Sequence, residues 1–580
     1  MSAPKNRSFL WLVPFAVYLL HSLLFRGWIV DDAGISFAYA RHLAEGHGLV
    51  SQPGMPRVEG YSNPLWVFLL ALPLLAGVFD PTITPKVLSL LLVAGAFALL
   101  DAALRRLSGG SRAVSLVVLL LAAVNTPFVI WTSSGLENPL YAFLFCLLLW
   151  IAVRERENLA QAGRRQALAA GLTAAAIALT RPEGVIYVVL YPLLTLAARK
   201  IDRSHLRAAA GRLAVYAVAF AVPFGLHFAF RVLYFQDVVP NTYYAKGEMG
   251  SGDLFATLTL EPARAAKLLD LMRSVAGPAG PLLLLALVAV LAWLLGRGRL
   301  RWGHSALFTF AALPGFAYLL LPDDWMTEYR MATPFFPFFY ALVVLLAADL
   351  GRSFFQTSEA RRLPALLGGI LAVGLSMLLF TGRSFAFVRQ PTIPFADVVF
   401  YFGDRYNRYA DALQVENPSI LLPDLGGALW TSKLRVYDLA GLCDRTIAKT
   451  RGRDQKAFYD YIFGEVQPTF LRTYYSWSLL SQLERDPRFQ RDYVPLVAFY
   501  EPEVKARAGR AYVSGEFIRR DIADRHPDVI AAIRQEMQED WKRDLTIRLN
   551  LPRPAKPGLK PGGSGPIPPP EEALRILGVN

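Results

Sequence analysis

Long apolar runs recur along the first two thirds of the chain, and short polar connections separate them. Most of these runs are long enough to cross the hydrocarbon core of a bilayer, about 30 Å, as a helix. The pattern predicts a polytopic α-helical membrane protein with about eleven spans. The predicted spans are residues 9–28, 86–104, 113–131, 139–153, 167–180, 184–198, 211–232, 278–296, 305–321, 333–350 and 363–381.

The connections between these runs are of two alternating kinds. One kind is rich in Arg and Lys, as in residues 105–112 and 154–165, and the other carries acids, aromatics, Gly and Pro, as in residues 133–139 and 234–246. Loops rich in Lys and Arg stay in the cytoplasm. We therefore expect a cytoplasmic N-terminus, acidic and aromatic loops outside, and everything after residue 382 outside.

Residues 63–79 break this alternation, although they are apolar enough to span. If they spanned, Arg105, Arg106 and Arg112 would lie outside, against the charge rule. We expect this segment to lie on the outer membrane face or to dip into it, within a first outer loop at 30–80 that contains juxtamembrane helices.

The last 200 residues carry frequent mixed charges and no long apolar run. Residues 418–422 and 434–439 read as strands, and residues 457–463 and 527–544 read as helices. We predict a membrane domain at 1–381, an extracytoplasmic α/β domain at 382–550, and a Pro/Gly-rich tail at 551–580.

Composition supports a membrane protein. Of 580 residues, 54% are hydrophobic and 18% are charged, against roughly 25% charged in soluble proteins. The net charge of +14 would suggest nucleic acid in a soluble protein, but here it indicates Lys and Arg on the cytoplasmic face, so the expected partners are membrane lipids. Cys146 lies in an apolar run and Cys443 in a mixed region, which argues against a bridge between them.

Two adjacent carboxylates, Asp31 and Asp32, stand where the first apolar run ends. A helix starting there would place Asp32, Ser36 and Tyr39 on one face. The structural alternative is that the two acids only cap this helix. One Asp suffices for a cap, however, and two at a bilayer edge carry a desolvation cost that favours binding or proton transfer.

Further polar and aromatic clusters occupy the other predicted outer loops. Each could be an interfacial anchor or a span end with extended charged side chains, but together they predict one site at the outer surface. A transporter or flippase, the second hypothesis, would instead show acids or helix breaks at mid-membrane depth. The candidate binding residues are Tyr39, Arg57, Glu59, Tyr61, Asn63, Glu137, Arg181, Glu183, Asn241, Tyr243, Tyr244, Lys246, Asp324, Trp325, Arg330, Asp424, Asp438 and Asp444.

The chemistry of such a site needs a donor that arrives in the membrane, because ATP and nucleotide sugars are not available outside. The sequence contains no Walker-type phosphate loop, metal-spaced Cys/His cluster or serine elbow. A polyprenyl-phosphate sugar fits, with its phosphate held by Arg or Lys and an acceptor hydroxyl activated by a base. Acids near the phosphate could hold Mg²⁺ or Mn²⁺, but no spacing demands a metal.

Several of these motifs resemble those of bacterial GT-C membrane glycosyltransferases, and most closely the terminal β-(1→2)-arabinofuranosyltransferase family of mycobacterial cell-wall synthesis. The resemblance lies in residues 31–37, 46–48, 59–63, 180–184, 241–246, 324–326, 423–426 and 438–448. The family's usual pair of glycines before Asp324-Trp325-Met326 is replaced here by Pro322-Asp323.

The resemblance implies a GT-C fold and a prenyl-phosphate donor, decaprenyl-phosphate arabinofuranose in the named family, in the inner (plasma) membrane of a bacterium. It implies that the catalytic acid of the first loop is Asp31 or Asp32, and that Glu137 is a second acid. We favour Asp31 as the base because its lower-dielectric position would raise its pKa. The acceptor could be a polysaccharide, a lipid-linked glycan or a protein such as pilin. A membrane receptor or scaffold is the third hypothesis.

Overall fold

The computed structural model describes residues 9–157, 164–197, 203–246, 262–321, 324–354, 358–499 and 514–550. The predicted tail at 551–580 and the Pro322-Asp323 pair lie outside these residues. Contacts divide the chain into two compact units. Unit 1 holds Met1–Val30, Ser62–Val232 and Ser251–Thr392, and unit 2 holds Asp31–Tyr61, Leu233–Gly250 and Ile393–Asn580.

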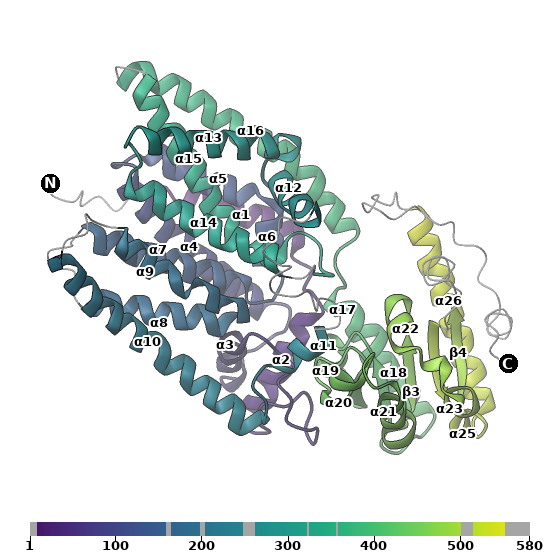
Figure 1. Cartoon of the computed structure of the whole chain (residues 1–580). Coiled ribbons are helices and arrows are strands. Elements are labelled where there is room, and N and C mark those ends of the chain that lie inside the picture. Colours follow the sequence, from purple (N-terminus) through teal and green to yellow (C-terminus); the bar gives the residue numbers. More distant parts are fainter. Residues whose placement is uncertain are drawn as a thin grey trace. The chain divides into compact units, whose positions relative to one another are not determined.

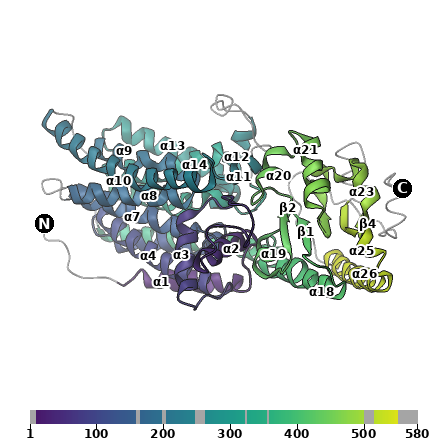
Figure 2. The same ribbon diagram turned by 90° about the horizontal axis from the view of Figure 1, so that it is seen from below.

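Unit 1 consists of helices (Figures 1 and 2). In chain order they are α1 (Leu12–Ser22), η1 (Leu23–Phe25), α3 (Pro64–Leu75), α4 (Thr84–Leu107), α5 (Arg112–Val124), α6 (Thr126–Thr132), α7 (Asn138–Glu157), α8 (Arg164–Thr180), η2 (Pro182–Val189), α9 (Leu190–Leu196), α10 (Arg203–Phe235), α12 (Pro262–Ala276), η5 (Gly277–Ala279), α13 (Gly280–Gly296), α14 (Trp302–Leu320), η6 (Arg330–Ala332), α15 (Phe335–Phe354) and α16 (Ser358–Arg389). The last residues of α10 belong to unit 2.

Seven helical segments among the described residues are long and apolar enough to cross a membrane, and each overlaps a predicted span. They are Thr84–Leu107, Asn138–Glu157, Ala209–Phe235, Pro262–Gly296, Trp302–Leu320, Phe335–Ser353 and Leu367–Arg389. The predicted span 113–131 falls on α5 and α6, which meet at an angle of 71°. Asn125 lies at the bend, where its side chain accepts the Phe128 N–H at 2.9 Å and so caps α6.

The remaining predicted spans fall on shorter helices. Residues 9–28 correspond to Leu12–Phe25, 167–180 to α8, and 184–198 to Pro182–Leu196. The count of eleven therefore stays a prediction. Helix α3 has 12 residues, which rise about 18 Å and so fall short of the bilayer core. The placement of 63–79 at the membrane face stays a prediction, because the predicted spans 9–28 and 184–198 also fall on short helices.

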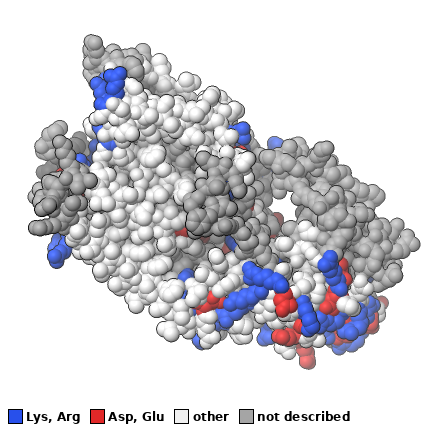
Figure 3. Space-filling model, in the orientation of Figure 1, with Lys and Arg blue, Asp and Glu red and all other residues white. Residues whose placement is uncertain are grey.

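Helix α7 lies at the centre of unit 1, because 72% of its apolar window is buried, against 11% for α10. Around α7, Phe145 packs edge-on against Tyr187 at 4.9 Å between ring centroids, and Phe310 lies 5.1 Å from Phe338. The peripheral helices instead expose large apolar side chains such as Leu226 and Leu378. In Figure 3 the described surface of these helices is mostly uncharged, whereas charges gather over unit 2. This pattern matches contact with lipid.

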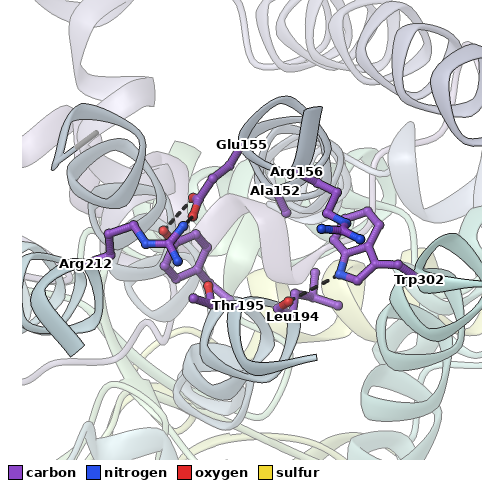
Figure 4. A pocket seen from close by; sticks show the side chains of 8 residues that line it. Ala152, Glu155, Arg156, Leu194, Thr195, Arg212 and Trp302 are labelled. Carbon is purple, nitrogen blue, oxygen red and sulfur yellow. Dashed lines mark hydrogen bonds and ion pairs between the residues drawn. The ribbon is translucent and has the colours of Figure 1, made fainter. Parts of the chain in front are cut away.

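A shallow pocket lies among α7, α9, α10 and α14 (Figure 4). The Glu155 carboxylate at its wall pairs with Arg212 and accepts the Tyr191 hydroxyl at 2.6 Å. The Trp302 indole donates to the Leu194 carbonyl at 3.2 Å. None of the predicted site residues lines this pocket, and its polar groups join the ends of four helices.

Unit 2 contains a five-stranded mixed sheet with helices around it. Its elements are α2 (Asp32–Ala44), α11 (Asn241–Lys246), α17 (Phe395–Val398), η7 (Val399–Asp404), α18 (Arg405–Ala412), β1 (Ser419–Leu422), α19 (Gly426–Thr431), β2 (Arg435–Asp438), α20 (Arg445–Thr450), α21 (Gln455–Asp460), η8 (Tyr461–Val466), β3 (Phe470–Thr473), α22 (Tyr475–Ser481), η9 (Leu483–Arg485), α23 (Pro487–Asp492), β4 (Tyr493–Phe499), β5 (Ser514–Arg519), α25 (Arg520–Ala523) and α26 (Pro527–Asn550). The strand order is β2-β1-β3-β5-β4. β1 runs parallel to β2 and β3, and β5 is antiparallel to β3 and β4.

Both predicted strands and both predicted helices of the C-terminal region are present, as β1, β2, α21 with η8, and α26. The sequence reading missed β3, β4 and β5. β4 contains Pro495, and its register with β5 shifts between Pro495 and Val497. A proline in a strand pattern argues against a strand, yet it is tolerated at such an irregularity.

The grouping of the first outer loop differs from the predicted domains. Residues 31–61 belong to unit 2 with residues 393–580, whereas the sequence placed them with the membrane domain. Residues 31–61 group with unit 2 because they pack against its C-terminal part. Arg41 of α2 donates to the Trp430 carbonyl at 2.8 Å and stacks on the Trp430 ring at 4.4 Å. Gln52 accepts the Val436 N–H at 2.8 Å.

The topology is testable with single cysteines at the two ends of α4. Thr82→Cys and Ala113→Cys both replace exposed residues, whereas Cys146 and Cys443 are buried. We expect an impermeant thiol reagent to label residue 82 only from outside, and residue 113 only from the cytoplasm. The reverse pattern would mean that 63–79 crosses the membrane.

Candidate active site

The carboxyl ends of the three parallel strands in unit 2 carry polar side chains. Asp424 follows β1, Asp438 is the last residue of β2, and Tyr474 follows β3. Sites in sheets with parallel strands lie at this edge. Asp424 and Asp438 are among the candidate binding residues predicted from the sequence, but no sequence motif identified Tyr474.

Asp31 lies at the start of α2 and is 3% exposed. Its carboxylate does not cap α2. Instead, Oδ1 accepts the Gly427 N–H at 2.7 Å and Oδ2 accepts the Gly426 N–H at 3.1 Å. The capping alternative is thus wrong for the Asp31 side chain, although α2 itself begins where the pattern predicted. Gly46, at φ +84°, follows its last turn.

The electrostatic surroundings of Asp31 disfavour the charged form of its carboxyl. Burial, the charge of Asp424 and the charge of Asp32 together hold the pKa of Asp31 well above its ordinary value, against the two amide contacts. Burial likewise raises the pKa of Asp424, whose Oδ2 accepts the Tyr474 hydroxyl at 2.5 Å. Asp32 is partly exposed.

Tyr39 and Tyr61 pack edge-on at 4.9 Å beside the Cys443 thiol. The Tyr39 hydroxyl donates to the Val58 carbonyl at 2.6 Å and accepts the Gly60 N–H at 3.2 Å. A Cβ on Gly60 would lie 2.4 Å from the Cys443 sulfur. Tyr39 and Tyr61 are both buried, so they shape the loop rather than offer an open face.

Asn241, Asp438 and Asp444 hold loops together. The Asn241 amide donates to the Gly441 carbonyl at 2.7 Å, and the Asn241 N–H donates to the Glu59 carbonyl at 3.0 Å. Asp438 accepts the Ala440 and Cys443 N–H groups, and burial raises its pKa to about 7. Asp444 caps α20 through the Ile447 N–H at 2.9 Å. These contacts give the three residues a structural role.

The other predicted residues of unit 2 lie around this framework. Arg57 stacks on the Tyr234 ring at 4.6 Å, and the Tyr244 hydroxyl donates to Asp237 at 2.7 Å. Glu59 is buried and Lys246 ends α11. Tyr243 is 66% exposed, so its ring is accessible to a ligand.

Unit 1 brings three sequence motifs together in a second polar cluster, the Glu137 cluster, made of Asn63, Glu137, Arg181 and Glu183. The Asn63 amide donates to Glu137 Oε2 at 2.7 Å. Arg181 pairs with both Glu137 and Glu183. Burial opposes ionisation of Glu137, but Arg181, Arg330 and Asn63 outweigh it and lower the Glu137 pKa. Glu137 is therefore an ionised ion-pair partner, unlike Asp31.

Arg330 connects this cluster to the motif at 324–330. It pairs with Asp324 at 2.8 Å and lies 6.0 Å from the centroid of the Trp131 ring, while the Trp131 indole donates to the Glu328 carbonyl at 2.8 Å. Trp325 is 47% exposed. The sequence reading did not select Trp131, nor Lys86, whose ammonium donates to the carbonyls of Phe25, Trp28 and Ser133.

The described part of the chain contains no evident set of ligands for a metal ion. No three His, Cys, Asp or Glu side chains come together there in a group that could hold one. The lone pairs of Asp31 are partly taken by amide N–H groups. No step of the chemistry below is therefore assigned to a metal.

The fold matches that of known membrane glycosyltransferases. The archaeal oligosaccharyltransferase AglB from Archaeoglobus fulgidus, solved with an inhibitory peptide and a dolichol-phosphate, superposes with a TM-score of 0.51 at 13% identity, covering 85% of this chain and 73% of that chain. ArnT from Cupriavidus metallidurans, bound to undecaprenyl phosphate, gives 0.52 at 14% identity, covering 80% and 92%. No protein-family model and no curated protein sequence matches the chain.

Both neighbours are GT-C glycosyltransferases. At this identity the likeness establishes the fold, so the chain has a GT-C fold, as the motif resemblance implied. Together with the apolar helices it identifies a multi-pass membrane protein. The narrower likeness to arabinofuranosyltransferases stays a prediction.

The Glu137 cluster makes a stability prediction. Arg181→Met would leave Glu137 and Glu183 buried without their shared cation, and breaking a buried pair costs about 3–5 kcal/mol. We expect a clear fall in the unfolding temperature in detergent. The matched control is Arg212→Met, which removes the ion-pair partner of Glu155 at the pocket of Figure 4. Its unfolding temperature should fall by a comparable amount. Wild-type stability of Arg181→Met would contradict the buried pair.

Proposed function

We propose that this protein is a membrane glycosyltransferase that moves a sugar from a polyprenyl-phosphate donor to an acceptor outside the cytoplasm. The observation that carries the proposal is the acid pair. Asp31 is a buried carboxyl with a raised pKa at the start of α2. The fold supports it, because the two neighbours above were solved with a dolichol-phosphate and with undecaprenyl phosphate.

The reaction follows from this placement. The acceptor oxygen attacks the anomeric carbon, the bond from that carbon to the phosphate oxygen breaks, and polyprenyl phosphate leaves with the electron pair. Asp31 takes the proton of the acceptor hydroxyl, since a raised pKa makes its carboxylate a stronger base. Asp32, partly exposed beside it, binds a sugar hydroxyl or positions the base. In unit 1, the candidates for binding the donor phosphate are Arg181 and Arg330.

The motif resemblance supports a finer assignment. We propose arabinofuranose as the transferred sugar, a glycan as the acceptor, and the bacterial plasma membrane as the location, with the N-terminus in the cytoplasm and residues 382–550 outside. The exposed rings of Tyr243 and Trp325 are proposed to stack on sugar C–H faces.

A protein acceptor is the second candidate. It is favoured by AglB, which was also solved tethered to an acceptor peptide, with a TM-score of 0.50. Transfer to a peptide rather than to a glycan would decide for this candidate.

The test is transfer of a labelled sugar from polyprenyl phosphate by purified protein in detergent. We expect Asp31→Asn to lower kcat about 10²–10⁴-fold, the usual cost of losing a general base, and Asp32→Asn to lower transfer as well. Asp528→Asn, which changes an exposed acid in the first turn of α26, should leave the rate unchanged.

Folding and donor-lipid binding are measured for each variant. If both Asp31→Asn and Asp32→Asn turn over within a few-fold of wild type, the acid pair is structural. The base would then be sought at Glu137 and next at Asp324.

A further inference from the structure

The loop after β1 holds Asp31 in place. Residues 423–427, here named the clasp loop, present two consecutive backbone N–H groups to the two oxygens of the Asp31 carboxylate. The Asp31 N–H in turn donates to the Ile393 carbonyl at 2.9 Å. Both the backbone and the side chain of Asp31 are thus fixed by residues more than 360 positions away.

This approach leaves no room for side chains. A Cβ on Gly34 would lie 2.4 Å from the Gly426 carbonyl carbon, and one on Gly426 would lie 1.8 Å from the Asp31 carbonyl oxygen. A Cβ on Gly427 would lie 2.5 Å from the Val399 nitrogen. Glycine at positions 34 and 426 allows α2 to reach the clasp loop by direct backbone contact, and glycine at 427 allows the loop to lie against Val399.

Asp424 belongs to the same loop and is held from the neighbouring strand. Its Oδ2 accepts the Tyr474 hydroxyl at 2.5 Å. Arg472 of β3 stacks on the Tyr474 ring at 5.0 Å and pairs with the buried Glu516 of β5. The position of Asp424 is therefore set by the sheet.

We propose that Asp424 and Tyr474 are positioning residues of the glycosyl transfer, which act through the clasp loop on Asp31. The proposal rests on the proposed function. It goes further, because it makes the strand ends of unit 2 part of the catalytic apparatus.

Asp424 and Tyr474 also have a second effect, which acts on the pKa of Asp31. Asp32 on α2 and Asp424 on the clasp loop both raise the pKa of Asp31, and Asp31 in turn raises that of Tyr474. Arg472 and Tyr474 lower the pKa of Asp424 and so favour its charged form. Removing the charge of Asp424 should lower the pKa of Asp31. The base then becomes weaker, and it loses its proton at lower pH.

The experiment compares Asp424→Asn and Tyr474→Phe with Tyr461→Phe. Tyr461 is a matched control, because its hydroxyl also donates to a buried carboxylate of unit 2, Asp444, at 2.8 Å. For both test variants we expect kcat to fall about tenfold, with the KM for donor lipid unchanged. The acid limb of the pH profile of kcat/KM should move to lower pH. Tyr461→Phe should keep the wild-type rate and profile.

Two results would overturn the proposal. One is a wild-type rate and acid limb in both test variants. The other is a loss of rate that is matched by Tyr461→Phe or explained by lost donor binding or stability, since either would indicate a folding role.

Hydrogen exchange separates this proposal from the proposed function. In Asp31→Ala the Gly426 and Gly427 amides should exchange faster than in wild type, whether or not the protein transfers sugar. If wild type transfers no sugar from polyprenyl phosphate, the proposed function fails. If these amides exchange at the wild-type rate in Asp31→Ala, the clasp loop does not hold Asp31.

Discussion

A carboxylate removed from water needs donors or a cation, and the two polar clusters of this protein meet that need in opposite ways. Glu137 is paired with Arg181 and keeps its charge. Asp31 receives two neutral amide donors and has acidic neighbours. The first arrangement stabilises an ion pair, whereas the second raises the pKa of the carboxyl. The division of labour between the clusters depends on this difference.

The sheet of unit 2 serves the Asp31 arrangement. Three parallel strands end at one edge of the sheet. The clasp loop follows β1, the Asp438–Cys443 turn follows β2, and Tyr474 follows β3. The buried core of Leu421, Phe458, Leu471 and Phe517 fixes the strands behind that edge. A sheet that looks like an accessory domain in the sequence therefore supports the acid pair of the first loop.

Hydropathy and charge predicted the helices of unit 1 well, because lipid contact imposes long apolar runs that a sequence displays directly. The strands β3 to β5 were missed because they are short and one contains Pro495. The residues of the Glu137 cluster were selected from three separate loops, each by its own composition. Tyr474 and Gly427 could not be found in this way. Tyr474 matters through its bond to Asp424, and Gly427 through its bond to Asp31, 396 positions earlier in the chain. Asn241 and Asp444 carried the same kind of sequence signal, yet the structure gives them caps and loop contacts.

The distance along the chain between Asp31 and its amide donors also sets an order of events during synthesis. The first loop emerges early, but residues 426 and 427 follow it by almost 400 positions. At about 5–20 residues per second, that gap lasts roughly 20–80 s. Until then, Asp31 and the buried face of α2 have no partner from the C-terminal chain. Completion of the acid site is therefore a late step of biogenesis, and a chain that stops before β1 leaves the ribosome with its spans made and its acid pair unassembled.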